Sequence, residues 1–345
     1  MCMVCNKVVN PVQLWYTVCI AEQPQKEVNI MKKMMLCVLA LVLALSLAAC
    51  GAADEKVNVF ALKGPTGIGL VGVMEDDAYN FTLAGAADEI VAAIASGSAD
   101  IAACPTNLAA TLYKKTNGNV QLMALNTLGV LHVVSNDPSI DSFDDLAGRK
   151  LYATGQASVP EYALRYILEQ NGLADKVEVE FIAEHSELAT LMAAGKADIG
   201  MLPEPHVTSV LMQNKDMQTV IDVTEAFESA AAKAGNEDMV LSMGCVIVRR
   251  EFAEKNPEKV SAFLDAYSAS VAMVNADPAA GELVQKHGIM PKAAVAARAI
   301  PNCHIVFVEG EAVRTQVEPL YQVLLAANPA SIGGALPGDD FYYVH

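Results

Sequence analysis

Several side chains that can bind the polar groups of a small molecule stand directly after apolar, strand-like segments of this chain. They are Lys63, Thr66, Gly67, Thr106, Asn107, Asn126, Thr127, Gln156, Ser158, Glu204 and His206. Ligands of open α/β sheets bind beyond the carboxyl ends of the strands, where a few polar groups fix their orientation. We therefore predict that these residues line a ligand-binding site. The sequence has no HExxH, GxSxG or Walker pattern, so we predict no catalytic residue and no bound metal.

These residues can also serve the fold alone. Lys63, Thr66 and Gly67 can lie in an ordinary solvated turn, and Asn126 and Thr127 can hydrogen-bond at a hinge. The residues that can instead cap a helix are Thr106, Asn107, Gln156 and Ser158. The alternative for Glu204 is a structural salt bridge. His132 and His185 are expected to pack in the core or lie at the surface rather than to bind a ligand. His185, His206 and Glu204 do not have the spacing of a metal site.

One glycine-rich segment has the spacing of a dinucleotide-binding loop. It reads Gly67-Ile-Gly69-Leu-Val-Gly72, and Asp88 and Glu89 follow about 20 residues later. A glycine-rich turn between a strand and a helix offers free N–H groups to many polar ligands, so the pattern alone is weak. Because the chain also carries an export signal, described below, we reject NAD and predict no cofactor.

Two stretches of the chain, 98 residues apart, share seven of 19 aligned residues, and chance similarity between Ala-rich helices is the alternative to a true repeat. EIVAAIASGSADIAACPTN, from Glu89 to Asn107, aligns without a gap with ELATLMAAGKADIGMLPEP, from Glu187 to Pro205. Each reads as a short amphipathic helix, a Gly that ends it, and a buried strand that ends at a polar loop. A helix–strand unit used twice predicts two similar α/β lobes. The lobes would face each other across a cleft, with residues 104–107 on one wall and 202–206 on the other.

Apolar runs and helical periodicity predict the other elements. Strands are expected at 57–62, 120–125, 130–135, 150–153, 177–182, 220–222 and 242–249, helices at 68–75, 108–115, 161–170 and 258–276, and a Gly-rich polar tail from residue 330. The strands 130–135 and 242–249 bracket the middle of the chain. We therefore predict an α/β protein in which 50–129 and 242–345 form lobe 1 and 130–241 forms lobe 2, with these two strands as a hinge.

Residues 31–50 have the pattern of an export signal. Met31-Lys32-Lys33 is a basic start, 34–46 is an uninterrupted apolar run, and Leu47-Ala-Ala-Cys50 follows. The run is short for a membrane span, so it predicts a cleaved signal peptide at 31–49. The ending resembles the bacterial lipobox, which implies a diacylglycerol on Cys50; a plain secretory peptide is the alternative. Because a signal peptide begins a chain, we expect translation to start at Met31 and residues 1–30 to be an artefact of the assigned start.

Composition limits the partners. The formal charge is −17, and residues 1–49 hold four basic and two acidic side chains, so the remainder carries −19. Such an acidic chain has no electrostatic footprint for nucleic acid. Beyond residue 50 the cysteines are Cys104, Cys245 and Cys303. Their odd number and wide spacing do not form a disulfide framework, so we predict buried free thiols.

Several segments resemble one family in the order in which they occur. Asp145-Leu-Ala-Gly-Arg-Lys-Leu151 resembles the entry to the second lobe in extracytoplasmic solute-binding proteins of ABC importers. Ala197-Asp-Ile-Gly200 with Glu204-Pro205 resembles a segment of the taurine, nitrate, sulfonate and thiamine-pyrimidine branch, and Asn256-Pro-Glu-Lys-Val with Phe263-Leu264 resembles its C-terminal helices. With the lipobox, the resemblance covers essentially all of 50–345. It implies a type II periplasmic-binding fold whose two lobes close on a small solute.

The same resemblance implies partners and a location. A solute-binding lipoprotein of this family works with an ABC permease and its ATPase subunit. The resemblance further implies a monomer that is anchored by its lipid to the outer face of the bacterial cytoplasmic membrane. Enzymes on the same fold, similar to pyrimidine synthases or chorismate dehydratases, are the main alternative, and a surface adhesin or sensor is another. We predict a binding protein rather than an enzyme, because those enzymes are cytosolic.

Two departures from the family bear on the solute. Pro203 stands where the family often has Trp, and no Arg lies in a predicted cleft loop. A bidentate clamp for sulfonate or phosphate is therefore missing, and an anion would depend on loop N–H groups, helix N-termini and Lys63. We expect a small polar or heterocyclic solute, neutral or cationic and nitrogenous, with Glu204 accepting its N–H groups.

Overall fold

The computed structural model describes residues 35, 55–277 and 279–344. The chain divides into two units, Met1–Glu55 and Lys56–His345, and the fold described below is that of the second. The proposed start at Met31, the signal peptide 31–49 except Met35, and the lipidation residue Cys50 lie outside the described residues. Within those residues, no helix has both the length and the apolar character that a membrane span requires.

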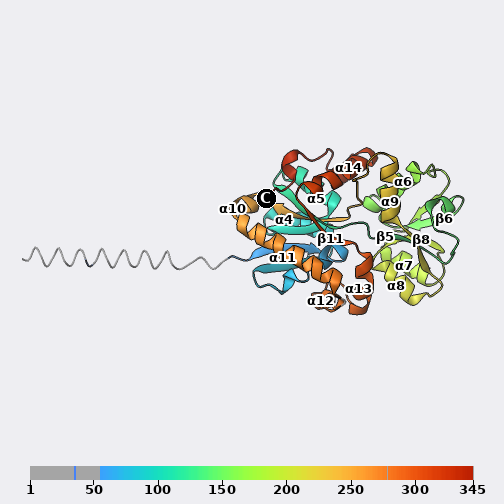
Figure 1. The fold of residues 1–345 in the computed structure, drawn as a ribbon, viewed down its shortest axis with the longest axis horizontal. Coiled ribbons are helices and arrows are strands. Elements are labelled where there is room, and N and C mark those ends of the chain that lie inside the picture. The colour runs from blue at the N-terminus through green and yellow to red at the C-terminus, as the bar shows by residue number, and fades with distance from the viewer. Residues whose placement is uncertain (1–34, 36–54, 278, 345) are drawn as a thin grey trace, which may run out of the picture. The chain divides into compact units, whose positions relative to one another are not determined.

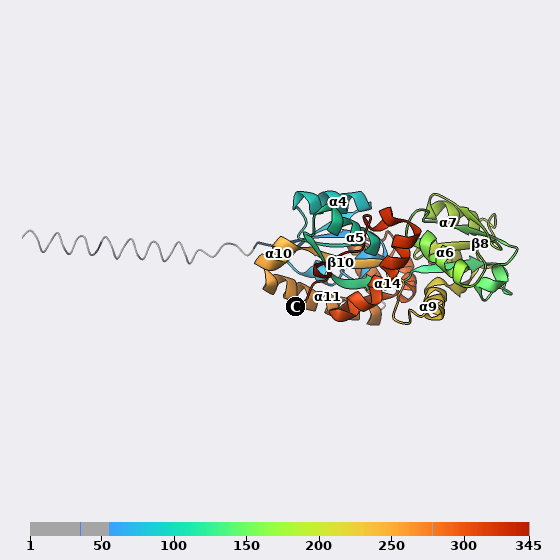
Figure 2. The same cartoon turned by 90° about the horizontal axis from the view of Figure 1, so that it is seen from above.

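Two mixed β-sheets organise this unit (Figures 1 and 2). Sheet A has the strand order β11-β4-β10-β3-β1-β2, and sheet B has the order β7-β6-β8-β5-β9. The strands are β1 (Val57–Leu62), β2 (Tyr79–Ala84), β3 (Ile101–Pro105), β4 (Val120–Thr127), β5 (Leu131–Ser135), β6 (Lys150–Ala153), β7 (Glu178–Phe181), β8 (Ile199–Pro203), β9 (Gln218–Asp222), β10 (Gly244–Arg249) and β11 (Ile305–Glu309).

The two sheets have the same topology. In sheet A, β1 pairs in parallel with β2 and β3, and β10 runs antiparallel between β3 and β4. In sheet B, β6 pairs in parallel with β7 and β8, and β5 runs antiparallel between β8 and β9. Each strand of sheet B therefore has a counterpart in sheet A, which confirms the predicted pair of similar α/β lobes.

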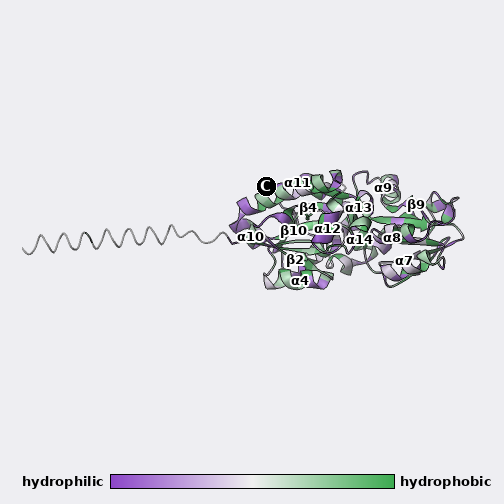
Figure 3. Cartoon of the chain, turned by 90° about the horizontal axis from the view of Figure 1, so that it is seen from below, coloured by the Kyte–Doolittle hydropathy of each residue, from purple (hydrophilic) through white to green (hydrophobic). Residues whose placement is uncertain are grey.

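Helices cover both faces of each sheet. The longer ones are α4 (Ala87–Ser96), α5 (Thr106–Lys115), α6 (Val159–Gln170), α7 (His185–Ala193), α8 (His206–Gln213), α9 (Val223–Lys233), α10 (Arg250–Lys255), α11 (Pro257–Ala276), α12 (Ala280–Lys286), α13 (Ala293–Ala299) and α14 (Glu311–Ala327). Alternate residues of β3 face opposite sides of the sheet. Ala102 and Cys104 pack in one core cluster, whereas Ile101 and Ala103 pack in another. The strand β3 is therefore buried on both sides. Figure 3 shows the contrast between the hydrophobic strand β10 of the same sheet and the hydrophilic helix α10.

Two short segments connect the lobes. β4 ends at Thr127 and β5 begins at Leu131, and the chain returns between α9 and β10. β5 pairs only within sheet B and β10 only within sheet A, among the described residues. The expectation that the strands 130–135 and 242–249 themselves run between the lobes is therefore corrected. Residues 128–130 and 234–243 make the crossings, and the two strands anchor them.

The sequence repeat forms equivalent units. α4 leads into β3 and α7 leads into β8, and both strands occupy the same place in their sheets. Gly97 and Gly195 follow the two helices with φ of 75° and 66°, values that a side chain rarely adopts. The aligned aspartates differ, because Asp100 is 7% exposed whereas Asp198 is exposed. The repeat therefore preserves the backbone path and changes what surrounds it.

The structure differs from the sequence-based assignment in several segments. The predicted helix 68–75 is instead the short α3 (Pro65–Ile68) followed by a 3₁₀ turn at Val73–Glu75. The strands β2 and β11 and the helix α9 did not appear in the sequence-based assignment. Within the Gly-rich polar tail, Phe341 is fully buried and Tyr342 forms a bridge with Leu122 of β4.

The cysteines agree with the prediction. Cys104, Cys245 and Cys303 are buried free thiols. Burial raises the pKa of Cys245 and of Cys303 well above the ordinary thiol value. Both therefore remain protonated at neutral pH and act as small apolar residues in the core.

Candidate functional site

The carboxyl ends of the parallel strands in each sheet lie next to the crossing between the lobes. In sheet A, Gly244 pairs with Pro105 at the end of β3 and with Thr127, after which the first crossing begins. In sheet B, Pro203 at the end of β8 lies opposite Leu131, the first residue after that crossing. Only residues 128–130 separate the two ends. The polar residues singled out from the sequence follow these strands, so they occupy facing edges of the two lobes.

Three of these residues in lobe 1 surround Gly244. The Asn126 side-chain amide donates to the Thr66 carbonyl oxygen at 3.1 Å, and the Thr127 hydroxyl donates to Oδ1 of Asn126 at 3.0 Å. A Cβ atom on Gly244 would lie 2.5 Å from that Oδ1 and 3.1 Å from Oγ1 of Thr66. Asn126 and Thr127 are each 1% exposed, whereas Thr66 is partly exposed. The two buried side chains therefore position the turn on which Thr66 lies.

Thr106 and Asn107, in the first turn of α5, have different surroundings. Thr106 is fully buried, with its hydroxyl 2.8 Å from that of Ser242, and its carbonyl oxygen accepts a hydrogen bond from the Tyr321 hydroxyl at 2.9 Å. Asn107 is partly exposed, and its amide donates to the Ser331 carbonyl oxygen at 3.2 Å. Thr106 thus fixes the start of α5 against the second crossing, while Asn107 remains within reach of solvent.

The glycine-rich segment packs tightly against α11. The Ser270 hydroxyl donates to the Gly69 carbonyl oxygen at 2.6 Å and accepts from the Gly72 amide at 2.9 Å. A Cβ on Gly69 would lie 3.0 Å from the Tyr267 hydroxyl, and one on Gly67 would lie 2.7 Å from a backbone oxygen. Close packing against α11 therefore accounts for Gly69 and Gly72, and the close approach to the Leu62 carbonyl oxygen of β1 accounts for Gly67, without a dinucleotide.

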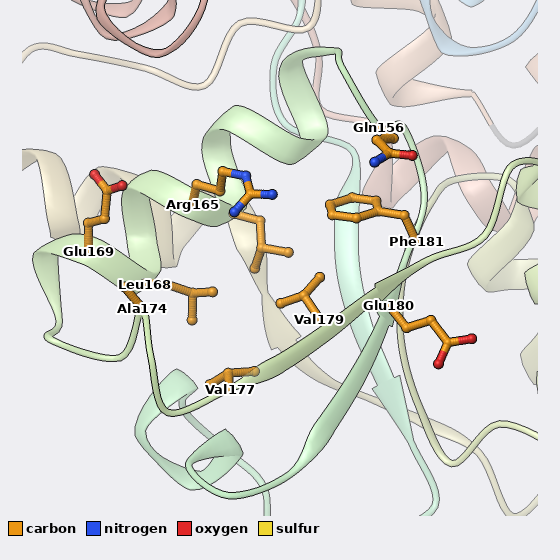
Figure 4. Close-up of a pocket in the computed structure, with 10 residues that line it drawn as sticks. Gln156, Arg165, Leu168, Glu169, Ala174, Val177, Val179, Glu180 and Phe181 are labelled. Atoms are coloured by element: carbon orange, nitrogen blue, oxygen red, sulfur yellow. The ribbon is translucent and has the colours of Figure 1, made fainter.

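The remaining candidates of lobe 1 and the α6 loop are more accessible. Lys63 and Gln156 are exposed, and Ser158 is partly exposed, with its hydroxyl donating to the Gly155 carbonyl oxygen at 2.6 Å. Gln156 lines a cavity of 520 Å³ within lobe 2, between α6 and β7. Figure 4 shows Gln156 beside Phe181 at one end of that cavity and Arg165 on the helix. Gln156 therefore lies at the junction of this cavity and the sheet edge.

Glu204 is buried and already bonded. It is 2% exposed, and its two oxygens accept hydrogen bonds from the amide and the hydroxyl of Thr208 at 3.1 and 3.0 Å. Asn302 of lobe 1 donates to Oε1 at 3.4 Å. Burial raises the pKa of Glu204, and the bonds from Thr208 and the nearby His132 counteract this. Glu204 thus holds the first turn of α8 and contacts the other lobe. Both of its oxygens are engaged within the protein, which does not support the expected role of Glu204 as an acceptor for a nitrogenous solute.

A histidine pair lies at the same edge of sheet B. The ring centroids of His185 and His206 are 5.5 Å apart, and Nδ1 of His185 is 2.7 Å from the Thr154 hydroxyl oxygen. Burial lowers the pKa of both imidazoles, and Glu184 partly offsets this for His185. Sequence reasoning placed His206 in the site but not His185. The signal that could have revealed the pair is the position of both residues just after strands of the same sheet.

A second group of polar residues joins the lobes at the crossing. His132 is 5% exposed, with Nε2 3.5 Å from the Asn302 carbonyl oxygen and Nδ1 3.9 Å from Oδ2 of Asp222. His304 also approaches Oδ2 of Asp222 at 3.9 Å, and its Nδ1 contacts the Gly129 carbonyl oxygen in the crossing itself. Sequence reasoning missed this cluster because its members come from β5, β9 and the segment before β11.

α6 and α14 meet along one side of the molecule. The Asn328 amide, just after α14, donates to the Tyr162 hydroxyl on α6 at 2.8 Å. A cavity of 650 Å³ lies between the two helices beside this bond. In the described part of the chain, no group of three His, Cys, Asp or Glu side chains is placed to hold a metal ion.

Comparison with known proteins identifies the fold. The model of the family described as NMT1/THI5 like matches residues 83–281. An ABC transporter structure from Parabacteroides distasonis is 22% identical, with a TM-score of 0.70 over 84% of this chain and 99% of that one. The periplasmic aliphatic sulphonate-binding protein SsuA from Escherichia coli is 16% identical, with a TM-score of 0.62 over 83% and 96%. These likenesses confirm the predicted two-lobe periplasmic-binding fold.

The same fold also occurs in an enzyme. The desulfurization enzyme DszB is 13% identical, with a TM-score of 0.53 over 79% of this chain and 92% of that one. No curated protein sequence matches the chain significantly.

Proposed function

Because the chain belongs to the NMT1/THI5-like family, we propose that it is the solute-binding protein of an ABC importer. The observation that carries this proposal is the pair of topologically equivalent sheets whose strands end at facing edges, joined by two short crossings. A ligand between such edges contacts both lobes only when they are close together, so binding favours the closed arrangement. The likeness to a periplasmic sulphonate-binding protein and to an ABC transporter supports it.

The site residues divide by exposure. We propose that the partly exposed and exposed ones contact the solute: Lys63, Thr66, Asn107, Gln156, Ser158 and His206. Gly67 is buried in the same turn as Thr66. The buried ones hold these groups in position: Thr106, Asn126, Thr127 and Glu204. Such a set has polar groups from both lobes and suits a small polar or heterocyclic organic molecule.

A membrane tether completes the proposal. The lipobox-like ending at Cys50 supports lipidation and a place on the outer face of the bacterial cytoplasmic membrane, beside the permease and its ATPase subunit. Expression with a radiolabelled fatty acid tests it. Label should enter the protein and be lost in Cys50→Ala, and equal labelling of both would contradict the tether.

Solute binding is tested by a thermal-shift screen of sulfonates, thiamine precursors, riboflavin-like rings, nitrate and amino acids. A solute at 100 times its dissociation constant adds about 2.7 kcal/mol to the free energy of unfolding, which raises the melting temperature. X-ray scattering with the best hit should then give a smaller radius of gyration. A bound solute that leaves the radius unchanged would contradict binding by lobe closure.

An enzymatic function is the second candidate, because the desulfurization enzyme DszB shares the fold. Each hit from the screen is incubated with the protein at a tenfold excess of solute and analysed by mass spectrometry. Recovery of unchanged solute supports a binding protein, whereas conversion of more than one equivalent establishes an enzyme.

A further inference from the structure

Three neighbouring strands of sheet B bring three side chains to one place. Thr154 directly follows β6, His185 begins the helix after β7, and His206 begins the helix after β8. β6 lies between β7 and β8, so its end is the centre of the group. The two rings stand 5.5 Å apart at an angle of 42°. The edge on which they lie is the one that faces lobe 1.

The hydrogen bonding leaves imidazole nitrogens for a ligand. Thr154 is fully buried, and its hydroxyl holds Nδ1 of His185 at 2.7 Å, so Nε2 is the nitrogen left to bind. The imidazole of His206 makes no hydrogen bond with another described residue, and the side chain is partly exposed. The pair therefore offers directed donors or acceptors that the fold itself does not use.

The local charges favour a negative group at this point. Both histidines are the first residues of helices, where the backbone dipole is positive, and Lys63 is exposed on the facing edge of lobe 1. Two exposed acidic residues oppose this near His185: Glu184, which precedes it, and Glu187 in the first turn of α7. Glu204 is turned to Thr208. α13, which packs against α8, carries the exposed Arg298.

We propose that His185 and His206 bind the acidic oxyanion group of the transported solute, a sulfonate or a carboxylate, and that the pair takes up one proton from water as the solute binds. This inference rests on the proposed solute-binding function and names the chemical class of its ligand. In the free protein, burial lowers the pKa of both rings; the nearby His185 lowers that of His206 further, and Glu184 partly offsets the effect for His185. Both rings therefore favour the neutral form. An oxyanion between the rings stabilises the protonated form of one imidazole, because the imidazolium can donate a charge-assisted hydrogen bond to it. Binding of the oxyanion therefore raises the pKa of that ring.

Proton uptake predicts how affinity depends on pH. Between the histidine pKa values of the free and the bound protein, affinity should rise about tenfold for each pH unit of acidification. A solute that binds without a proton shows no such slope. A neutral analogue of the same shape has no oxyanion to stabilise the imidazolium, so it should not cause proton uptake.

The test follows the histidine rings directly. The full chain is labelled with ¹³C in the histidine rings and titrated by NMR in 100 mM ethanesulfonate, propionate, ethanesulfonamide or sodium chloride. His185→Gln and His206→Gln assign the two signals, and His287, which contacts Glu75 in lobe 1, is the internal control. We expect at least one oxyanion to raise the pKa of one member of the pair by about one pH unit. Ethanesulfonamide and sodium chloride should leave the titration of the pair unchanged, and none of the four additions should change that of His287.

Several outcomes would overturn the inference. It fails if neither oxyanion changes the titration of the pair, if ethanesulfonamide changes it equally, or if the change disappears when EDTA is added, which would indicate a metal between the rings. Failure of the proposed function looks different. If a solute of any charge reduces the radius of gyration of the protein while both histidines titrate as they do in the free protein, the proposed solute-binding function stands. The proton-linked site is then rejected.

Discussion

Asn328 of lobe 1 donates its side-chain amide to the hydroxyl of Tyr162 in lobe 2 at 2.8 Å, and this bond joins the end of α14 to α6. Tyr162 is 6% exposed and Asn328 is partly exposed, so the bond is partly buried. Because the two residues come from different lobes, the bond links the lobes directly, and we expect it to contribute to the arrangement in which they are close. It is therefore a direct probe of lobe closure.

Tyr162→Phe removes that bond and leaves the ring in place. A hydrogen bond of this kind contributes about 0.5–1.5 kcal/mol, so solute affinity should fall about two- to tenfold, as measured by calorimetry with a hit from the screen. Asn328→Ala should have a similar effect, and the double variant should lose little more than either single one. Tyr152→Phe, elsewhere in lobe 2, is the matched control. Equal affinity in all variants would show that the bond does not contribute to the bound state.

The repeat provides a matched pair for stability. Asp100 accepts bonds from the amide and side chain of Asn58, both at 3.0 Å, and pairs with Arg249 at 3.0 Å. Removing one member of a buried ion pair costs about 3–5 kcal/mol, so Asp100→Ala should lower the free energy of unfolding by that order in urea titrations. The aligned Asp198 is exposed, with Asn136 at 3.4 Å. Asp198→Ala should change stability by less than about 0.5 kcal/mol. Equal losses would contradict the difference in burial.

The sequence predicted features that depend on neighbouring residues. Apolar runs, the Gly that ends each repeat helix and the repeat itself are local, so the central strands and the two lobes were foreseen. The strand β2 has only a partial alternation of buried and exposed residues, and the tail gains its order from Tyr342 beside Leu122, 220 residues earlier in the chain. Such elements become definite only through contacts distant in sequence.

The same distinction between local sequence signals and contacts distant in sequence applies to the candidate site. The positions of its residues follow from where strands end, and these were predicted. Their burial was not, because it depends on distant partners: Ser242 for Thr106 and Asn302 for Glu204. The pairing of His185 with His206 also requires β6, β7 and β8 to lie side by side, which no spacing in the sequence states.

Glu204 should make stability depend on pH. Burial raises its pKa above the ordinary value of 4.5, so between these two values the folded protein holds a proton that the unfolded chain has lost. The stabilising contribution is therefore present below pH 4.5 and is lost as pH rises through the folded pKa. Glu204→Gln cannot ionise, so its stability relative to the wild type should improve as pH is raised from 4.5 to 7 in urea titrations.

The exposed Glu187 on α7 provides the control for that experiment. Glu187→Gln should follow the wild type at each pH. If the difference between Glu204→Gln and the wild type is the same at pH 4.5 and 7, Glu204 is not the carboxyl group whose ionisation is opposed by burial.

Gly72→Ala tests the explanation of the glycine-rich segment by packing. A Cβ at this position would lie 2.7 Å from the Ser270 hydroxyl oxygen, which bonds both Gly69 and Gly72. Forcing a methyl group into a packed interior costs about 1–3 kcal/mol, and the melting temperature should fall accordingly. At Gly85 the nearest atom is the flexible end of Glu89 at 3.4 Å, so Gly85→Ala should be nearly neutral. A stable Gly72→Ala protein that loses solute binding would instead assign this glycine to the binding site and reject the packing role.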